Sequence, residues 1–416
     1  MARNIIISPS FLRMMPWTLQ VNSEGKLSVD LNGDTCIEIT PRNVALLALG
    51  MLLHDIAKPY VLQGEKHALL GYSWLDDQSI RFILGELHLQ SITNQLSGND
   101  FESIREAVLL HHLKVDERYG ASLNGKTLKN KLAVCFSHPF DYIASSIYGF
   151  INPKCVDSLE KHSKKVFYNV NPFTRVVYQA PYDKIMDDVD DLIKQRLPND
   201  ALNIYRERAR ERTYEPACDV PLFDHAFFSA VLTLLLLAPG ISGIRTISKN
   251  QMKRTEIEKV FIDLIRGCEA FWLVVDATGL WKLTERSLKP RDLEAFAKFA
   301  REACRLIAEI VSELAAKYLA QGDAMLENVV KLLTPISREG SVFVALLPGS
   351  AALHIRNELL SEVAKKLSCT IGVATDHLLN VLRSSVAIGL AAVDIGNVKE
   401  LTDVPQATHS NSDQAL

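Results

Sequence analysis

The chain has 416 residues, a formal net charge of −3, 48% hydrophobic residues and 23% charged residues. This length predicts two or three domains, and the composition is that of an ordinary globular protein with ample core material. The near-neutral charge excludes a generally basic protein that coats nucleic acid, while a local basic groove stays compatible with it.

The number and spacing of the cysteines indicate a reducing compartment. Seven are scattered along the chain and form no CxxC pair, so a zinc finger is not expected. We expect reduced thiols, as in cytoplasmic proteins. The most apolar stretch, residues 226–237, is too short to span a bilayer and is expected to be broken by Pro239 and Gly240. We therefore predict a cytoplasmic protein without a membrane partner.

Residues 1–42 predict an N-terminal β segment, with a hairpin that turns at Asn32-Gly33. From residue 43 the apolar spacing becomes helical, and residues 43–245 are predicted to form an all-helical domain. The expected helices are 43–57, 66–75, 76–88, 99–113, 126–149 and the buried 221–237, with a polar loop at 113–126 and an irregular segment at 150–180.

Residues 183–212 form a highly charged helical stretch that is acidic at its start and basic at its end. It is either a solvated helix face or a basic patch for a nucleic-acid backbone. The predicted nucleic-acid contacts are Lys114, Lys126, Lys129, Arg206 and Arg210.

The character of the sequence changes in residues 246–396, where strands and helices alternate. Strands are expected at 270–276, 329–334, 341–347, 370–375 and 386–394, with two helices within 291–320 and one at 351–367. We interpret this order as β-α-β-β-α-β, a ferredoxin-like domain, so the expected fold class is α+β. Residues 397–416 are polar and predicted to be disordered.

Histidines and carboxylates gather where a helical hydrolase would need them. His54 and Asp55 are adjacent after an apolar helical run, and the other candidate ligands follow along the chain. The predicted metal ligands are His54, Asp55, His67, His111, His112, Asp141 and His225. Imidazole and carboxylate ligands suit one or two divalent transition-metal ions, with Mn, Fe, Co, Ni and Zn all compatible. Such ions activate water against a phosphodiester, and Lys58, one turn beyond the pair, could meet a phosphate oxygen. His54, Asp55 and Lys58 are thus the predicted catalytic residues.

Most of these residues have a plainer interpretation as well. His54-Asp55 could belong to an ordinary solvated helix segment. His67 could be a surface histidine, and His111-His112 an ordinary helix end. Asp141, after Pro139, and Asp224 are both compatible with helix N-caps.

In their order, these motifs resemble the HD-superfamily nuclease domain of CRISPR large subunits, from type III and type I-D effector complexes. Residues 220–230, containing Asp224-His225, are similar to that family's Leu-Tyr-Asp-His segment, and residues 141–146 to its Ala-Asp-x-x-Ser-Ser segment. Residues 271–281, 285–287 and 340–347 resemble parts of its first palm domain.

The resemblance implies a circularly permuted HD nuclease domain followed by a palm-like domain, and metal-dependent cleavage of single-stranded DNA. Guide RNA and other effector subunits would be the partners. The family's Gly-Gly-Asp-Asp motif is absent, so no cyclase or polymerase activity is expected, and the chain looks like a truncated or reduced form. Asp276, which ends a hydrophobic strand as metal-binding aspartates of palm polymerases do, is accordingly interpreted as structural.

Two other functions stay open. An HD phosphohydrolase acting on nucleotides or cyclic nucleotides would need aromatic side chains to stack on the base, and Trp74, Tyr72 or Tyr142 could serve. A catalytically inactive scaffold subunit, which binds only guide RNA or partner subunits, would have nearly the same sequence.

Overall fold

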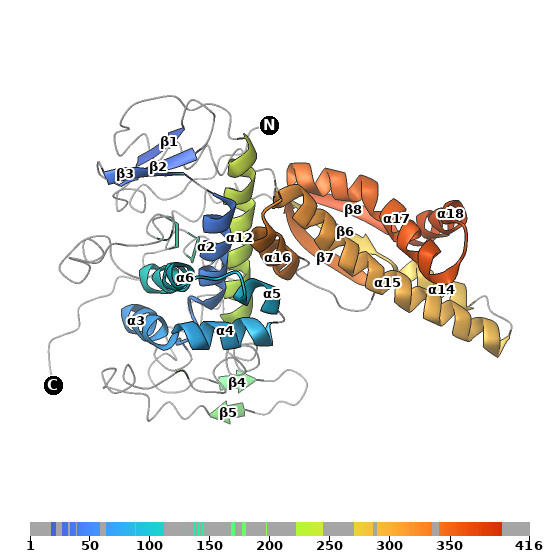
Figure 1. The fold of residues 1–416 in the computed structure, drawn as a ribbon. Coiled ribbons are helices and arrows are strands. Elements are labelled where there is room, and N and C mark those ends of the chain that lie inside the picture. The colour runs from blue at the N-terminus through green and yellow to red at the C-terminus, as the bar shows by residue number, and fades with distance from the viewer. Residues whose placement is uncertain are drawn as a thin grey trace, which may run out of the picture.

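The structure is a computed structural model, mostly helical with small antiparallel sheets, which confirms the α+β class (Figure 1). It describes residues 18–21, 27–31, 34–38, 40–58, 64–87, 89–111, 133, 136–137, 140–141, 144, 168–170, 177–179, 197, 222–243, 270–285, 289–320, 322–334 and 341–392.

Two long helices form the centre of what we call the helical region. α2 (Pro41–Leu53) and α12 (Leu222–Gly243) pack against each other, although some 170 residues separate them in the chain (Figure 1). Around them lie α3 (Gly64–Trp74), α4 (Asp77–Glu86), α5 (Gln90–Thr93) and α6 (Gly98–Leu110). The starts of these helices agree with the predicted ones within a few residues, apart from the short α5, which was not predicted. The predicted break at Pro239-Gly240 is wrong, because α12 continues through both residues to Gly243.

α2 shows how the sequence sets a helix start and end. The Thr40 side chain accepts a hydrogen bond from the Asn43 N–H at 3.2 Å, and Pro41 occupies the first turn, where its missing N–H costs nothing. Every residue from Val44 to Leu53 is buried. The prediction that this helix continues to residue 57 is wrong: α2 ends at Leu53, and residues 54–58 form turns.

The predicted N-terminal hairpin is confirmed, since β2 (Leu27–Leu31) pairs antiparallel with β3 (Asp34–Glu38). β1 (Thr18–Val21) adds a third strand to this sheet. Residues 150–180 are not wholly irregular as predicted, because β4 (Tyr168–Val170) and β5 (Val177–Gln179) form a short antiparallel pair.

A second three-stranded sheet defines what we call the sheet region. Its order is β7-β6-β8, and both pairings are antiparallel. Its strands are β6 (Ala270–Asp276), β7 (Val342–Pro348) and β8 (Ala387–Ala392), and its helices are α14 (Thr278–Glu285), α15 (Pro290–Leu319), α16 (Ala324–Leu333), α17 (Gly349–Ile371) and α18 (Thr375–Ser385). α17 packs on all three strands and on α15.

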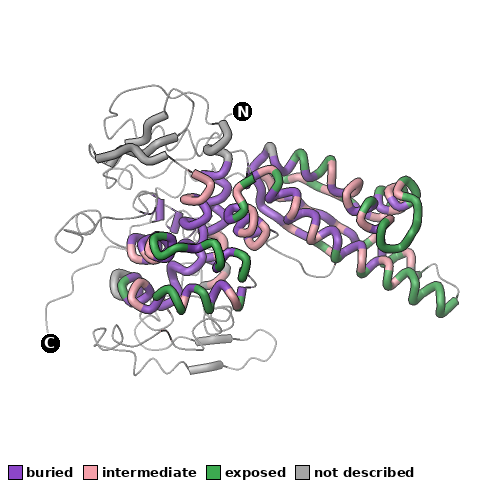
Figure 2. Tube along the Cα trace, in the orientation of Figure 1, coloured by how far each residue is buried: buried purple, intermediate pink, exposed green. Residues whose placement is uncertain are grey.

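Three predictions for this region are wrong. Residues 291–320 hold one helix rather than two, because apolar side chains recur at helical spacing from Ala300 to Leu319 without an interrupting glycine or proline. Its first turns project into solvent (Figure 2). Residues 370–375 form no strand, since Gly372 adopts φ 69° and ends α17 in a left-handed cap.

The third error concerns residues 329–334, which belong to α16 and not to a strand. A strand assignment fits the local run Val329-Val330, but Met325, Leu326, Val329, Val330 and Leu333 are the buried set, and this spacing has the helical period. The Asp323 carboxylate caps the helix by accepting from the Leu326 N–H at 2.8 Å. The described residues therefore contain three strands of this sheet and do not complete the predicted β-α-β-β-α-β order.

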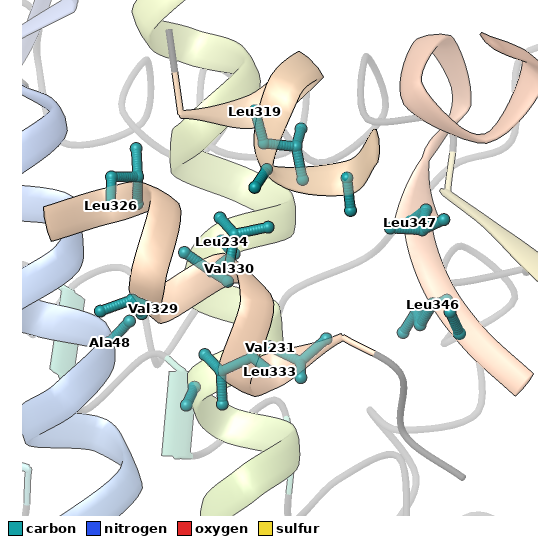
Figure 3. Packing of buried hydrophobic residues seen from close by; sticks show 14 of the residues in the cluster. Ala48, Val231, Leu234, Leu319, Leu326, Val329, Val330, Leu333, Leu346 and Leu347 are labelled. Carbon is teal, nitrogen blue, oxygen red and sulfur yellow. The ribbon is translucent and has the colours of Figure 1, made fainter. Parts of the chain in front are cut away.

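α16 joins the two regions. Its apolar face packs against α2, α5 and α12 of the helical region, and its chain neighbours α15 and β7 belong to the sheet region. Figure 3 shows Val329 facing Ala48 of α2, and Val330 beside Leu234 of α12. One continuous hydrophobic core thus runs from α2 through α16 to the sheet.

Some predictions lie outside the described residues: most of the 126–149 helix, the charged stretch 183–212 apart from Leu197, and the tail from 397. Among the helices that are described, none combines the length and apolar character needed to cross a membrane.

Candidate metal centre

Five segments of the helical region bring histidine and aspartate side chains into one buried cluster. His54 and Asp55 follow α2, His111 follows α6, His67 lies on α3 and His225 on α12. Asp141 comes from a helical position between α6 and α12. The cluster members are His54, Asp55, His67, His111, Asp141 and His225, and none is more than 5% exposed.

Four donor atoms form the first ligand group, made of His54 Nε2, Asp55 Oδ2, Asp141 Oδ1 and His225 Nε2. The His54 nitrogen lies 3.5 Å from each of the two carboxylate oxygens. The His225 nitrogen lies 2.9 Å from Asp141 Oδ1 and 3.9 Å from Asp55 Oδ2. Two sequence-adjacent residues and two distant ones thus surround a common point.

The other oxygen of Asp55 belongs to a second ligand group, with His67 Nε2 and His111 Nε2. Asp55 Oδ1 lies 3.0 Å from the His67 nitrogen and 3.5 Å from the His111 nitrogen. The two imidazole nitrogens are 3.2 Å apart. Asp55 therefore faces both ligand groups, one oxygen to each.

Backbone carbonyls set the tautomers of two histidines. His54 Nδ1 lies 2.6 Å from the Met51 carbonyl, and His111 Nδ1 lies 2.5 Å from the Val108 carbonyl. A carbonyl only accepts, so each Nδ1 carries the proton and each Nε2 presents its lone pair to the cluster. Both carbonyls belong to the last turn of a helix, where they lack an intrahelical partner.

The tautomer of His54 leaves its Nε2 lone pair in an unfavourable environment. Its Nε2 is buried and makes no hydrogen bond with the described residues. Its lone pair would face two carboxylate oxygens, which is repulsive unless Nε2 is protonated or a cation lies between them. Accordingly, although burial lowers the pKa of His54, the Asp55 and Asp141 carboxylates raise it overall above its usual value.

The remaining pKa shifts keep the second ligand group in metal-binding form. Burial, helped by nearby His54, lowers the pKa of His111 to about 4, and burial also lowers the pKa of His67. Burial alone would raise the pKa of Asp55, but Lys58 and the histidines hold it well below its ordinary value. Neutral imidazoles and an ionised carboxylate are the forms that bind metals.

The donor set fits a divalent metal ion. Atoms bound at about 2.1 Å from a common ion lie roughly 3.0–3.4 Å from one another, close to the separations in both groups. In two triads, His54 with Asp55 and His111, and His54 with Asp141 and His225, all ligand atoms lie within 4.8 Å of one another. The buried cluster could thus hold a metal ion, and a cation among these donors would relieve the repulsion at His54 Nε2.

Lys58 lies at the edge of the cluster. Its Nζ is 2.9 Å from Asp55 Oδ2, and its side chain is 11% exposed. The lysine therefore brings one positive charge next to the first ligand group, with a small part of its side chain open to solvent.

The structure also bears on the plainer interpretations. His67 is completely buried, so the surface alternative for it is wrong. The predicted residues His112, Lys114, Lys126, Lys129, Arg206 and Arg210 lie outside the described residues, as does the side chain of Asp224.

Two of the three aromatic residues suggested for stacking on a base, Trp74 and Tyr72, do not fit that role. Trp74 is 2% exposed and packs in the core, and the Tyr72 hydroxyl donates to Glu102 at 2.6 Å beneath the Arg105 guanidinium. Tyr142 lies outside the described residues. Asp276 accepts from the Thr278 N–H at 2.8 Å, a structural contact at the start of α14.

Sequence reasoning missed the carbonyls of Met51 and Val108. The available signal was the position of each histidine immediately after an apolar helix, three residues beyond the carbonyl it contacts. The predicted helices extend past both histidines, and in a helix that continues, those carbonyls would accept intrahelical hydrogen bonds instead.

None of the family models and none of the curated proteins compared with the sequence matches it. Among solved structures, the chain is similar to a Csm1–Csm4 cassette without ligand, at 15% identity and a TM-score of 0.44. It is also similar to the Csm1–Csm4 cassette in complex with cA3, at 15% identity and a TM-score of 0.43, and with pppApApA, at 14% and 0.43.

The alignments cover 84% of this chain. They cover 44% of the matched chain in the first two cases and 45% in the third. This chain thus spans less than half the length of the chains it matches.

Proposed function

We propose that the protein is a metal-dependent phosphodiesterase, a nuclease of the HD superfamily that cleaves single-stranded DNA within a CRISPR-type effector complex. The observation that supports this most is the convergence of three histidines from three other chain segments, His67, His111 and His225, on the Asp55 carboxylate, at 3.0–3.9 Å in a buried cluster. Building such a cluster from chain segments up to 171 residues apart has no evident benefit for a plain core.

In the proposed reaction, the metal ions and the protein side chains have different parts. Divalent ions held by the cluster would supply an activated water and positive charge next to the scissile phosphate. The chain's own part is to keep His54 and His111 in the tautomer that presents Nε2, and to keep Asp55 ionised between the two groups. Lys58, which neutralises Asp55, would meet a phosphate oxygen of the substrate.

The DNA substrate and the partners rest on the sequence resemblance. Under this proposal the β segment 1–42 is followed by the HD domain, residues 43–245, and then by a palm-like domain, residues 246–396. Lys114, Lys126, Lys129, Arg206 and Arg210 would contact the nucleic-acid backbone, and His112 would add a ligand to the metal centre. Guide RNA and other effector subunits would be partners in the cytoplasm.

The test is a cleavage assay with the purified full chain on end-labelled single-stranded DNA, with Mn²⁺, Ni²⁺ or Co²⁺ added after chelation. We expect cleavage that His54→Ala and Asp55→Asn reduce by at least about 100-fold, because each removes a ligand. His377→Ala, on the exposed surface of α18, is the matched histidine control and should cleave as wild type does.

The competing functions predict different results. Hydrolysis of mononucleotides or cyclic nucleotides, without DNA cleavage, would assign the site to a nucleotide phosphohydrolase. Absence of both activities, together with absence of bound metal, would favour a scaffold subunit. Cleavage that survives in both ligand variants would contradict the assignment of the reaction to this cluster.

A further inference from the structure

We propose that Gly50 and Gly71 are positioning residues of the metal centre. Their missing side chains let α2 and α3 close onto α6, and this close packing sets the separation of the donor atoms of His54, His67 and His111. The inference rests on the metal-dependent function proposed above and adds to it the part of the fold that determines ligand spacing.

Gly50 lies where α2 touches α6. A Cβ atom at Gly50 would stand 2.4 Å from the Ala107 Cβ and 2.9 Å from the Ile104 carbonyl oxygen, whereas ordinary contacts of this kind are 3.4–4 Å. The glycine is not required by its backbone, because only Gly322 and Gly372 have positive φ angles among the described glycines. A glycine in a helix interior weakens the helix relative to alanine, so its benefit here is the close approach.

The register of this contact points to the metal centre. Gly50 precedes His54 by four residues, and Ala107 precedes His111 by four. Residues four apart lie on the same face of a helix, one turn above each other. The contact therefore lies one turn from both imidazoles, whose ring centroids are 4.7 Å apart.

Gly71 makes the corresponding contact between α3 and α6. It follows His67 by four residues, and a Cβ on it would stand 2.9 Å from the Val108 Cγ1. Val108 also supplies the carbonyl that contacts His111 Nδ1. The approach of α3 thus bears on the His67–His111 spacing, while the Val108 side chain can yield more than the Ala107 Cβ and backbone can.

The surroundings leave little room for adjustment. Ala107, Val108 and Ile56 are completely buried, and close-packed interiors transmit a displacement rather than absorb it. A methyl group added at Gly50 would therefore move α2 away from α6 and separate His54 from His111. The ligands themselves would be unchanged in identity.

The experiment is calorimetric titration of Co²⁺ into the metal-free full-length protein, combined with the visible absorption spectrum of the Co²⁺ form. We expect Gly50→Ala to weaken Co²⁺ binding by roughly 10–100-fold and to alter the spectrum, because displaced ligands change the coordination geometry. Gly71→Ala should have a smaller effect of the same kind. Gly85→Ala on α4 is the matched control, since a Cβ there meets nothing within 4 Å, and should bind as wild type does.

A compensating substitution separates positioning from general loss of stability. Ala107→Gly removes the atom nearest to the new methyl group, so Gly50→Ala combined with Ala107→Gly should recover part of the lost affinity and spectrum. Recovery is partial because the Ile104 oxygen stays within 2.9 Å of the added Cβ.

The outcomes are distinguishable. Wild-type affinity and spectrum in a folded Gly50→Ala variant, or losses that merely add up in the double variant, would overturn the inference. If Gly50→Ala does not fold by circular dichroism, Gly71→Ala decides by the same criteria. A wild-type protein that binds no Co²⁺ would instead contradict the proposed function itself.

Discussion

His54 and His111 occupy equivalent places at the ends of two neighbouring helices, and both direct Nε2 into the buried cluster. Each ring donates from Nδ1 to a carbonyl of the last helical turn, so its other nitrogen is directed into the cluster. Asp55, next to His54, faces both ligand groups with its two oxygens. At the residue scale, the candidate metal centre is thus organised around one carboxylate.

Asp55 and Asp141 should therefore differ in their effect on metal content. We expect Asp55→Asn to abolish metal binding in both ligand groups, because it touches both. Asp141→Asn should weaken only the first group, which contains Asp141 and His225. Metal analysis of the purified variants by mass spectrometry gives the stoichiometry, and equal metal loss in the two variants would contradict the division into two groups.

The lowered pKa of His111 predicts a pH dependence of stability in the metal-free protein. Its pKa is about 4 when folded and 6.5 ordinarily, so between these values the unfolded chain binds more protons than the folded one. Stability should consequently fall as the pH falls from about 6.5 to about 4, by on the order of 3 kcal/mol from this group. Burial shifts the pKa of His67 in the same direction.

Urea unfolding of chelator-treated protein at pH 7 and pH 4 measures this effect. The His111→Gln variant lacks the titrating group and should lose less stability than wild type over the same interval. Since His54 and His67 are kept in both proteins, the difference is assigned to His111. An identical loss in the two proteins would contradict the assignment.

At the scale of elements, α16 had the least predictable role. Its sequence is compatible with both a short buried strand and an amphipathic helix. It forms a helix because this places five apolar side chains on one face, where they are buried in the core. That core is supplied by α2 and α12, from the helical region. The local sequence contains the helical spacing of apolar residues, but the helices that bury these residues, α2 and α12, lie far away in the chain.

Leu326 tests the contribution of α16. It is completely buried, and Leu326→Ala should lower the free energy of unfolding by about 2–5 kcal/mol, because the cavity cannot fully collapse. Leu353→Ala on α17, where the leucine is 49% exposed, is the matched control and should cost less than about 0.5 kcal/mol. Urea unfolding followed by circular dichroism measures both, and similar values for the two variants would contradict the packing described for α16.

At the scale of the whole molecule, the helical region and the sheet region share one hydrophobic core, because α16 fills the space between them (Figure 3). A boundary near residue 245 is predicted from the change of sequence character, yet side chains from beyond this boundary pack directly on α2. The two regions are therefore not expected to be independent in stability.

Hydrogen exchange measures this coupling. We expect amides of α2 and of β6 to exchange with the same limiting free energy, since both require the shared core to open. Leu326→Ala should lower both values equally. A free energy for β6 that is lower than for α2, and insensitive to this substitution, would show that the regions unfold separately.

The sequence by itself determined the elements whose stability is mostly local. The N-terminal hairpin follows from its turn and alternation, and most helices of the helical region follow from apolar spacing. It also identified six side chains that the fold brings together, because burying histidine or aspartate in an apolar helix costs free energy unless the side chain has polar partners.

Tertiary structure alone decided what depends on distant partners. It placed Asp55 between two ligand groups, ended α2 at Leu53 so that the Met51 carbonyl became available to His54, and made residues 324–333 a helix between two regions. The physical reason is the same in each case. The free energy of these arrangements comes from contacts between segments far apart in the chain, and spacing within one segment does not encode them.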